Sequence, residues 1–125
     1  MESTAYYDFK PMVQGTDWER TLEFKTNGVA DDLTDYDAHA TFRDKPNIGG
    51  AIVIDLTTTP NAQGSVIVIS ASTGLITFRI VDVDSDGFLV DKLYWDLKLI
   101  GPAADGSKES VPIRGTLPVI RKITV

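Results

Sequence analysis

Apolar and polar residues alternate along most of the chain, and this two-residue period limits the fold more than any other feature. In the segment KLYWDLKLI, one face carries four apolar residues: Leu93, Trp95, Leu97 and Leu99. The segment LITFRIV repeats the pattern with Ile76, Phe78 and Ile80. Side chains of a β-strand point alternately to the two faces of a sheet, so the pattern predicts strands with one face buried.

Aromatic residues supply much of the predicted core. The five on the apolar faces of predicted strands are Trp18, Phe24, Phe42, Phe78 and Trp95. Large aromatic side chains on such faces are typical of a core. In the segment DWERTLEFK the same face also holds Arg20, which we expect near the rim of the core.

Turn-forming residues separate the alternating segments. Asn27-Gly28 is the dipeptide preferred in a two-residue hairpin, because both positions tolerate positive φ. Glycine and proline also break the pattern at residues 45–50, 57–64 and 101–107. We count about seven to nine short strands and no helical pattern of about ten residues or more. The sequence therefore predicts an all-β fold, an immunoglobulin-like two-sheet β-sandwich, with a small closed barrel as the alternative.

The length predicts a single domain over residues 1–125. Residues 1–13 do not alternate cleanly, and their apolar residues are Tyr6, Tyr7, Phe9 and Met12. We expect them to form an N-terminal arm. Near the C-terminus, two prolines in the alternating segment 110–119 predict an edge strand or a bend.

Composition excludes several functions. The formal net charge is −6 and the pI about 4.6, which argues against binding to a nucleic-acid backbone. The chain has no cysteine, so thiol nucleophiles, disulfides and thiolate metal sites are excluded. We find no apolar run long enough to span a membrane and no signal-peptide pattern. We therefore expect a protein made in the cytoplasm that leaves its cell by lysis or within a particle.

The acidic segment VDVDSDG, residues 81–87, resembles the start of a calcium-binding loop. Asp82, Asp84 and Asp86 would occupy positions 1, 3 and 5 of an EF-hand, with Gly87 at position 6. Position 12 requires a bidentate glutamate, but the residue there is Leu93. The flanking segments are also predicted strands rather than helices, so an EF-hand is excluded.

Two interpretations of this segment remain. The favoured one is a solvated inter-strand loop in which Gly87 permits a turn. The alternative is a looser calcium site formed by Asp82, Asp84 and Asp86, with Asp91 as a further ligand. If any cation binds this chain, we expect it to bind here; we predict no other cofactor.

Catalytic residues are few. His39 is the only histidine, and the pattern places it on the polar face of a predicted strand, where we expect an exposed structural residue. Paired carboxylates are a second route to catalysis, and the candidates are Asp31, Asp32, Asp35 and Asp37. Aspartate is also a common turn former, and we expect that role here. The sequence therefore predicts a protein that is not an enzyme.

A set of turn and strand motifs runs through residues 7–46. It comprises a Gln-Gly turn, an alternating strand, a hairpin, a DLT-x-Y segment and a strand that ends in Arg-Asp. The residues that carry it are Gln14, Gly15, Leu33, Thr34, Tyr36, Arg43 and Asp44. The set resembles the opening of a group of small virion proteins of tailed bacteriophages.

The second half carries further motifs of that group: G-x-I-x-x-x-I, a strand containing W-D-L, and a final hairpin around Asp-Gly. Their residues are Gly74, Ile76, Ile80, Tyr94, Trp95, Asp96, Leu97, Asp105 and Gly106. The pattern is also similar to the N-terminal immunoglobulin-like domain of upper baseplate proteins in lactococcal-type phages. That domain holds a receptor-binding device on the tail. Here no stalk follows residue 125, so we expect a free-standing tail, collar or capsid accessory subunit.

The resemblance implies a non-enzymatic structural protein of the virion that contacts other phage proteins within a symmetric homo-oligomeric assembly. We expect the contacts to come from the N-terminal arm and from the segment VIRKITV, whose apolar residues beside a basic pair suit strand addition to a partner. The predicted interface residues are Tyr6, Tyr7, Phe9, Met12, Ile120, Arg121, Lys122 and Ile123. The alternative is a carbohydrate-binding or host-surface recognition module, in which two or three exposed aromatic residues on one face would stack on a saccharide.

Overall fold

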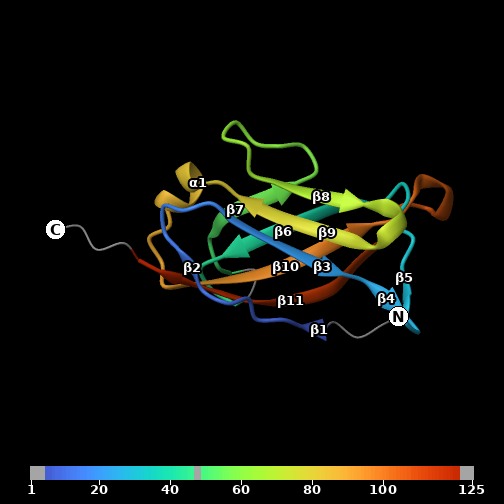
Figure 1. Ribbon diagram of the computed structural model, residues 1–125, viewed down its shortest axis with the longest axis horizontal. Helices are drawn as coiled ribbons and strands as arrows, with labels where there is room; N and C mark the ends of the chain where they lie inside the picture. The colour runs from blue at the N-terminus through green and yellow to red at the C-terminus, as the bar shows by residue number, and fades with distance from the viewer. Residues whose placement is uncertain (1–4, 47–48, 122–125) are drawn as a thin grey trace.

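The computed structural model describes residues 5–46 and 49–121, which form mainly β-strands (Figure 1). Within these residues, the strands of five residues or more are β3 (Trp18–Glu23), β6 (Asp37–Arg43), β7 (Ile52–Thr57), β8 (Val66–Ser70), β9 (Leu75–Ile80), β10 (Lys92–Ile100) and β11 (Glu109–Ile120). The two-residue strands are β1 (Ala5–Tyr6), β2 (Met12–Val13), β4 (Lys25–Thr26) and β5 (Val29–Ala30). The helical segments are α1 (Asp82–Asp86), η1 (Ala71–Thr73) and η2 (Ala103–Asp105). The all-β prediction is confirmed.

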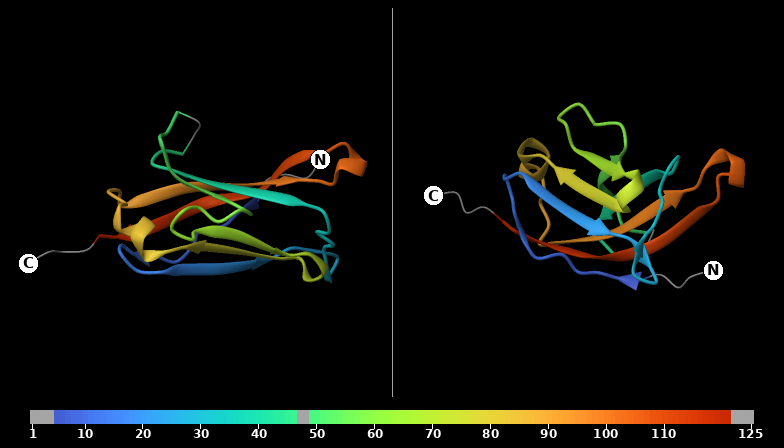
Figure 2. Two further views of the ribbon diagram at one scale, coloured as in Figure 1. Left: turned by 90° about the horizontal axis from the view of Figure 1, so that it is seen from above. Right: turned by 45° about the vertical axis from the view of Figure 1, so that its right-hand side comes forward.

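The strands form two layers that face each other across the core (Figure 2). The larger sheet is curled and has the order β1-β11-β10-β6-β7, with β2 also paired to β11. The smaller sheet has the order β3-β9-β8, and β4 and β5 form a separate hairpin. Asn27 and Gly28 make the turn of that hairpin with φ of 52° and 79°, as the sequence predicted.

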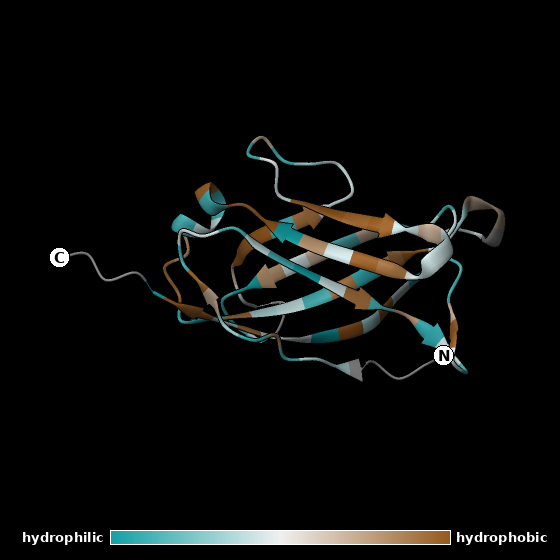
Figure 3. Cartoon of the chain, viewed as in Figure 1, coloured by the Kyte–Doolittle hydropathy of each residue, from teal (hydrophilic) through white to brown (hydrophobic). Residues whose placement is uncertain are grey.

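Strand β10 lies in the middle of the larger sheet, antiparallel to both β6 and β11. Its odd-numbered residues from Leu93 to Leu99 are buried, and its even-numbered residues face outward, with Lys92 exposed and the others half-buried. Figure 3 shows the resulting alternation of hydropathy along the strands. The same period buries Ile76, Phe78 and Ile80 of β9, so the faces predicted from the sequence are confirmed.

Arg20 lies outside the core, as expected. It is exposed on β3, and its guanidinium lies 5.6 Å from the centre of the Trp18 ring. Of the five predicted core aromatics, Phe24 is only partly buried, and the other four are at most 3% exposed. Phe88 is also buried, although the sequence pattern did not place it.

Part of the predicted N-terminal arm belongs to the core of the domain. Phe9 and Met12 are 3% and 2% exposed. The Phe9 ring lies 5.0 Å from Trp18 and 4.9 Å from Trp95, and it contacts Phe78 edge-on at 5.7 Å. The expectation that Phe9 and Met12 lie in an arm available to another subunit is therefore wrong, because these apolar side chains fill the space between the two sheets.

The N-terminal segment is fixed to the sheet by parallel pairing with β11. The backbone N–H of Tyr7 donates to Arg114 at 2.8 Å, and that of Phe9 donates to Thr116 at 2.9 Å. Between these bonds the segment crosses Gly115, where a Cβ atom would overlap the Tyr7 carbonyl oxygen and lie 2.5 Å from its carbon. Gly115 is therefore required for this close approach.

Strand β11 fits the prediction of an edge strand or a bend in part. Its pairing with β10 shifts in register at Val111 and Pro112, as expected for a bend at a proline, while β1 and β2 cover parts of its outer side. Residues 113–114 pair with β1, and residues 119–120 pair with β2. Pro112 and Pro118 each immediately precede one of these paired stretches. Because β1 and β2 are very short, they pair with this edge without requiring a backbone N–H donor from every residue of β11, and the two prolines are tolerated.

Candidate functional site

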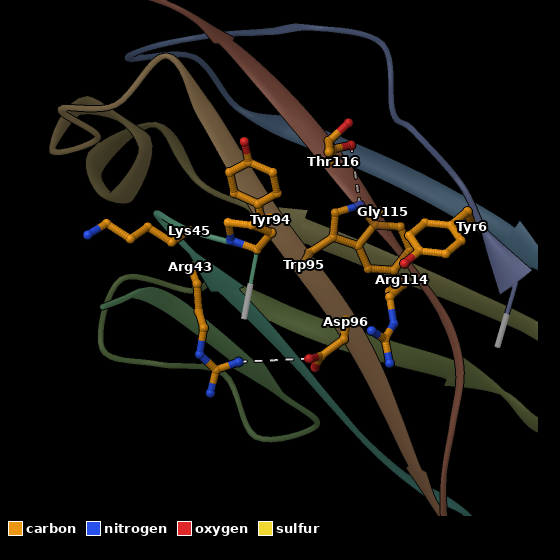
Figure 4. Close-up of a pocket in the computed structure, with 10 residues that line it drawn as sticks. Tyr6, Arg43, Lys45, Tyr94, Trp95, Asp96, Arg114, Gly115 and Thr116 are labelled. Atoms are coloured by element: carbon orange, nitrogen blue, oxygen red, sulfur yellow. Dashed lines mark hydrogen bonds and ion pairs between the residues drawn. The ribbon is translucent and has the colours of Figure 1, made fainter. Parts of the chain in front are cut away.

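A pocket of about 410 Å³ lies on the outer face of the larger sheet, where β1, β6, β10 and β11 are neighbours (Figure 4). Its chemistry is carried by six side chains: Tyr6, Arg43, Lys45, Tyr94, Asp96 and Arg114. They come from both ends of the chain and from its middle, so the pocket exists only in the folded sheet.

Strand register explains why these side chains meet. Tyr94 and Asp96 are even-numbered residues of β10, so both face away from the core. Tyr94 is the register partner of Arg43 on β6, and Asp96 is the partner of Arg114 on β11. Arg114 is also the partner of Tyr6 on β1. Directly opposed residues have Cβ atoms about 5 Å apart, which brings these groups within reach of one ligand.

The buried Trp95 and the backbone at Gly115 also line the pocket. The indole Nε1 of Trp95 donates a hydrogen bond to the carbonyl oxygen of Thr116 at 3.3 Å. Figure 4 shows the Trp95 ring beneath Gly115, with Tyr6 and Tyr94 on either side. A pocket with an aromatic floor and polar walls is the usual form of a small-ligand site.

The pocket carries more positive than negative charge. Arg43 and Asp96 form a long ion pair, with Nη1 3.8 Å from Oδ2. Within residues 5–46 and 49–121, neither the Arg114 guanidinium nor the Lys45 ammonium has an ion-pair or hydrogen-bond partner. Arg43 Nε is buried and has no hydrogen-bond partner among the same residues. Arg43 and Arg114 thus flank one carboxylate, and Lys45 also lines the pocket, in a chain with a net charge of −6.

Two other basic side chains on the same face lie beside carboxylates. Lys98 Nζ lies 3.6 Å from Glu109 Oε1, and His39 Nε2 lies 3.3 Å from Asp55 Oδ1. His39 therefore lies on the outward face of β6, as expected, but it is half-buried rather than exposed.

The acidic segment 81–87 is not the loop that we expected. Asp82 to Asp86 form the short helix α1, and Gly87 has φ of −81°, which any residue adopts. The helix forms because its neighbours hold it: Ser85 is fully buried, its Oγ donates to the Thr16 carbonyl at 2.8 Å and accepts the Gly15 N–H at 3.0 Å. The Gln-Gly turn and the acidic segment therefore form one structural unit.

The carboxylates of α1 take part in that unit. Asp84 Oδ2 accepts hydrogen bonds from the hydroxyl of buried Ser65 and, at 2.9 Å, from Asn61 Nδ2. Asp82 Oδ1 accepts the N–H of Val83 at 2.8 Å. The described part of the chain contains no group of three histidine, cysteine or acidic residues arranged to hold a metal ion. The calcium site at Asp82, Asp84 and Asp86 stays a prediction.

A chelator experiment tests that prediction. We expect Asp84→Ala to reduce the free energy of unfolding by about 1–3 kcal/mol in EDTA and in calcium alike, because the buried Ser65 hydroxyl loses its acceptor. Thermal melts under both conditions measure the loss. Asp82→Ala is the matched control, since its carboxylate accepts a local backbone bond. A loss seen only with calcium would support the metal site instead.

Three of the four candidate catalytic carboxylates accept hydrogen bonds from threonine hydroxyls. Asp31 accepts the Thr26 hydroxyl at 2.7 Å, and Asp37 accepts the Thr58 hydroxyl at 2.8 Å. Asp35 adopts a positive φ of 63°, a conformation that aspartate tolerates in turns. Asp32 accepts both the hydroxyl and the N–H of Thr34. The contacts of Asp31 and Asp32 and the conformation of Asp35 are those of turn formers, whereas the bond of Asp37 links β6 to the segment after β7.

The two hydrogen bonds from Thr34 affect the acid titration of Asp32. The Thr34 hydroxyl, at 2.6 Å, and its backbone N–H, at 3.0 Å, lower the pKa of exposed Asp32 below its usual 3.8. Because the pKa of Asp32 is lower in the folded state than in the unfolded state, its ionised form stabilises the fold at pH values above the unfolded-state pKa. This stabilisation is lost as the pH falls through the folded-state pKa. We expect Thr34→Val to move the pKa of Asp32 back toward 3.8 and Thr34→Ser to leave it low, as measured by NMR titration. An unchanged titration in Thr34→Val would contradict this assignment.

The other predicted interface residues that the structure describes lie along the edge of the larger sheet formed by β1, β2 and β11. Tyr6 is 75% exposed, Tyr7 45% and Ile120 55%. Exposed Arg121 lies 3.7 Å from Asp91 through Nη1, so its charge is partly used within the domain. Lys122 and Ile123 lie outside the described residues.

Comparison with protein-family models and with characterised proteins gives no match for this chain. No helix among the described residues is both long and apolar enough to cross a bilayer. Function must therefore be argued from the residue resemblance and from the geometry of the surface.

Sequence reasoning did not identify the pocket. Alternation had placed Arg43 and Arg114 on polar strand faces, which was the available signal. It could not show that β10 lies between β6 and β11, nor that β1 brings Tyr6 beside Arg114. These are long-range pairings, and no local pattern encodes them.

Proposed function

We propose that this chain is a non-enzymatic structural subunit of a tailed-bacteriophage particle, with an immunoglobulin-like fold. It would make protein–protein contacts in the tail, the baseplate, the fibre-attachment region or the head, within a symmetric homo-oligomeric assembly. The motif resemblance suggests the setting. The observation that carries the proposal is the group of exposed apolar side chains along the β1–β2 edge of the larger sheet.

The apolar edge consists of four side chains, each more than 40% exposed: Tyr6, Tyr7, Val13 and Ile120. Val13 and Ile120 are register partners, and Tyr6 and Tyr7 lie further along the same side of β11. Exposed apolar side chains that gather on one edge are typical of a protein interface, and tyrosine is common at its centre.

The shape of this edge favours packing over strand addition. Strand addition needs a long row of free backbone groups, whereas β1 and β2 are only two residues each. Side chains that project from a rigid sheet would therefore carry most of the contact. A two-fold or ring-shaped assembly could repeat this contact between identical subunits.

Incorporation into particles tests the proposal. Phage particles purified from the strain that carries the gene should contain the chain in defined stoichiometry by quantitative mass spectrometry. A strain complemented with the Val13→Ser, Ile120→Ser double variant should incorporate at least about tenfold less, as expected for loss of about 1.4 kcal/mol or more of contact energy.

The matched control is Val68→Ser, which removes an equally exposed valine on β8 of the smaller sheet. It should incorporate normally. Absence of the native chain from purified particles would overturn the assignment, and equal incorporation of both variants would remove the edge as the contact surface.

The pocket favours a second candidate function, recognition of a saccharide on a host surface. Tyr6 and Tyr94 flank it, and charged side chains able to bond hydroxyl groups line its walls (Figure 4). Such binding is compatible with a place in a particle, because the pocket and the apolar edge share only Tyr6.

A further inference from the structure

We propose that the pocket binds the negatively charged group of an acidic saccharide, a sugar ring that carries a carboxylate or a phosphate. This inference rests on the second candidate function and is independent of assembly into particles. It is carried by three observations: the unbalanced cations, the two tyrosines, and the single carboxylate between the arginines.

The cations select for a negative ligand. Arg114 and Lys45 have no ionic partner within the described residues, and Arg43 reaches Asp96 only at 3.8 Å. The guanidinium of arginine presents five N–H donors in a plane and binds carboxylate or phosphate through two of them at once. Figure 4 shows Arg43 and Arg114 approaching Asp96 from opposite sides. An anion placed there can bond both.

The tyrosines select for a ring. Tyr6 is 75% exposed on β1, and Tyr94 is half-buried on β10. An exposed aromatic face packs against the apolar C–H face of a sugar, while its hydroxyl bonds the sugar hydroxyls. Because the pocket lies between these two residues, a single ring or a short oligosaccharide can contact both of them (Figure 4).

Asp96 selects for hydroxyl groups beside the charge. A carboxylate accepts hydrogen bonds from hydroxyls and repels a second negative charge. A ligand with one acidic group per ring and free hydroxyls suits this arrangement better than an acidic peptide or a nucleic acid. The net charge of −6 also opposes binding of a dense polyanion.

Titration with a matched pair of probes tests the proposal. The probes are a tetramer of galacturonic acid and the same tetramer with every carboxylate methyl-esterified, followed by calorimetry and by amide NMR shifts. The acidic tetramer should bind with Kd of about 1 mM or tighter, and the ester at least about tenfold more weakly. Raising the salt concentration should weaken only the acidic probe.

Variants locate the binding. Arg114→Gln removes an exposed charge and should weaken the acidic tetramer at least about tenfold, and Tyr6→Ala should weaken both tetramers. Lys108→Gln is the control, because it removes the same charge from an exposed loop residue outside the pocket. It should bind like the native chain.

Further probes separate the sources of the charge. Glucose 1-phosphate that binds in an Arg114-dependent way supports the phosphate form of the proposal. If the ester binds as tightly as the acidic tetramer, the pocket does not select for negative charge, but the result still supports saccharide recognition. If tetraglutamate binds as tightly as the acidic tetramer, the proposal that the ligand is a saccharide is wrong. If neither acidic sugar binds, the proposed ligand of the pocket and the second candidate function are both wrong. Incorporation into particles is unaffected by these outcomes.

Discussion

Replacement of Gly115 by alanine is expected to cost about 3 kcal/mol or more of the free energy of unfolding, among the largest losses for a one-carbon change. The added Cβ would occupy the position of the Tyr7 carbonyl and would also lie 3.2 Å from Trp95 Nε1. Both neighbours are held, Tyr7 by its bond to Arg114 and Trp95 by the core. Denaturant unfolding followed by tryptophan fluorescence measures the loss.

Gly87→Ala is the control for this variant. Gly87 has φ of −81°, and a Cβ there would lie 3.5 Å from Asp84 O, an ordinary contact. We expect a change within about 0.5 kcal/mol. A Gly115→Ala protein as stable as Gly87→Ala would show that the N-terminal segment does not lie over β11 in solution.

The strand faces were predictable because burial on one side of a strand imposes a two-residue period that the sequence records directly. This is why Leu93, Trp95 and Phe78 were assigned correctly to the core. The turn at Asn27-Gly28 was predictable for an equally local reason, its positive φ. Such features depend on neighbouring residues along the chain.

The N-terminal segment and α1 were not predictable, because distant residues decide both. Phe9 lacks an alternating neighbourhood, and only the cavity between the sheets makes its burial favourable. The helix at Asp82 to Asp86 is too short to form alone and depends on the bonds of Ser85 and Asp84 to segments far away in sequence.

The candidate site combines both cases. Its side chains lie on faces that alternation predicted as polar, but its charge balance depends on which strands are neighbours. A strand order without β11 beside β10 would separate Arg114 from Asp96 and reduce the excess of cations in the pocket. Strand order is set by the whole core, so the pocket could be found only in the folded structure.

Truncation of Phe9 is expected to be the most damaging change within the N-terminal segment. Phe9→Ala should cost about 3–5 kcal/mol, because it removes a buried ring and leaves a cavity among Trp18, Phe78 and Trp95. These neighbours are rigid rings on two different sheets, so the space cannot close easily. Thermal and denaturant unfolding measure the loss, and near-ultraviolet circular dichroism reports the changed tryptophan packing.

Tyr6→Ala provides the comparison, three residues away in the same segment. Its side chain is 75% exposed, so its truncation should change stability by no more than about 0.5 kcal/mol. The contrast distinguishes the two accounts of this segment. In a free arm, both truncations would be mild; in a segment that completes the core, only Tyr6→Ala would be. A mild Phe9→Ala would therefore restore the arm and make its apolar residues available to a neighbouring subunit.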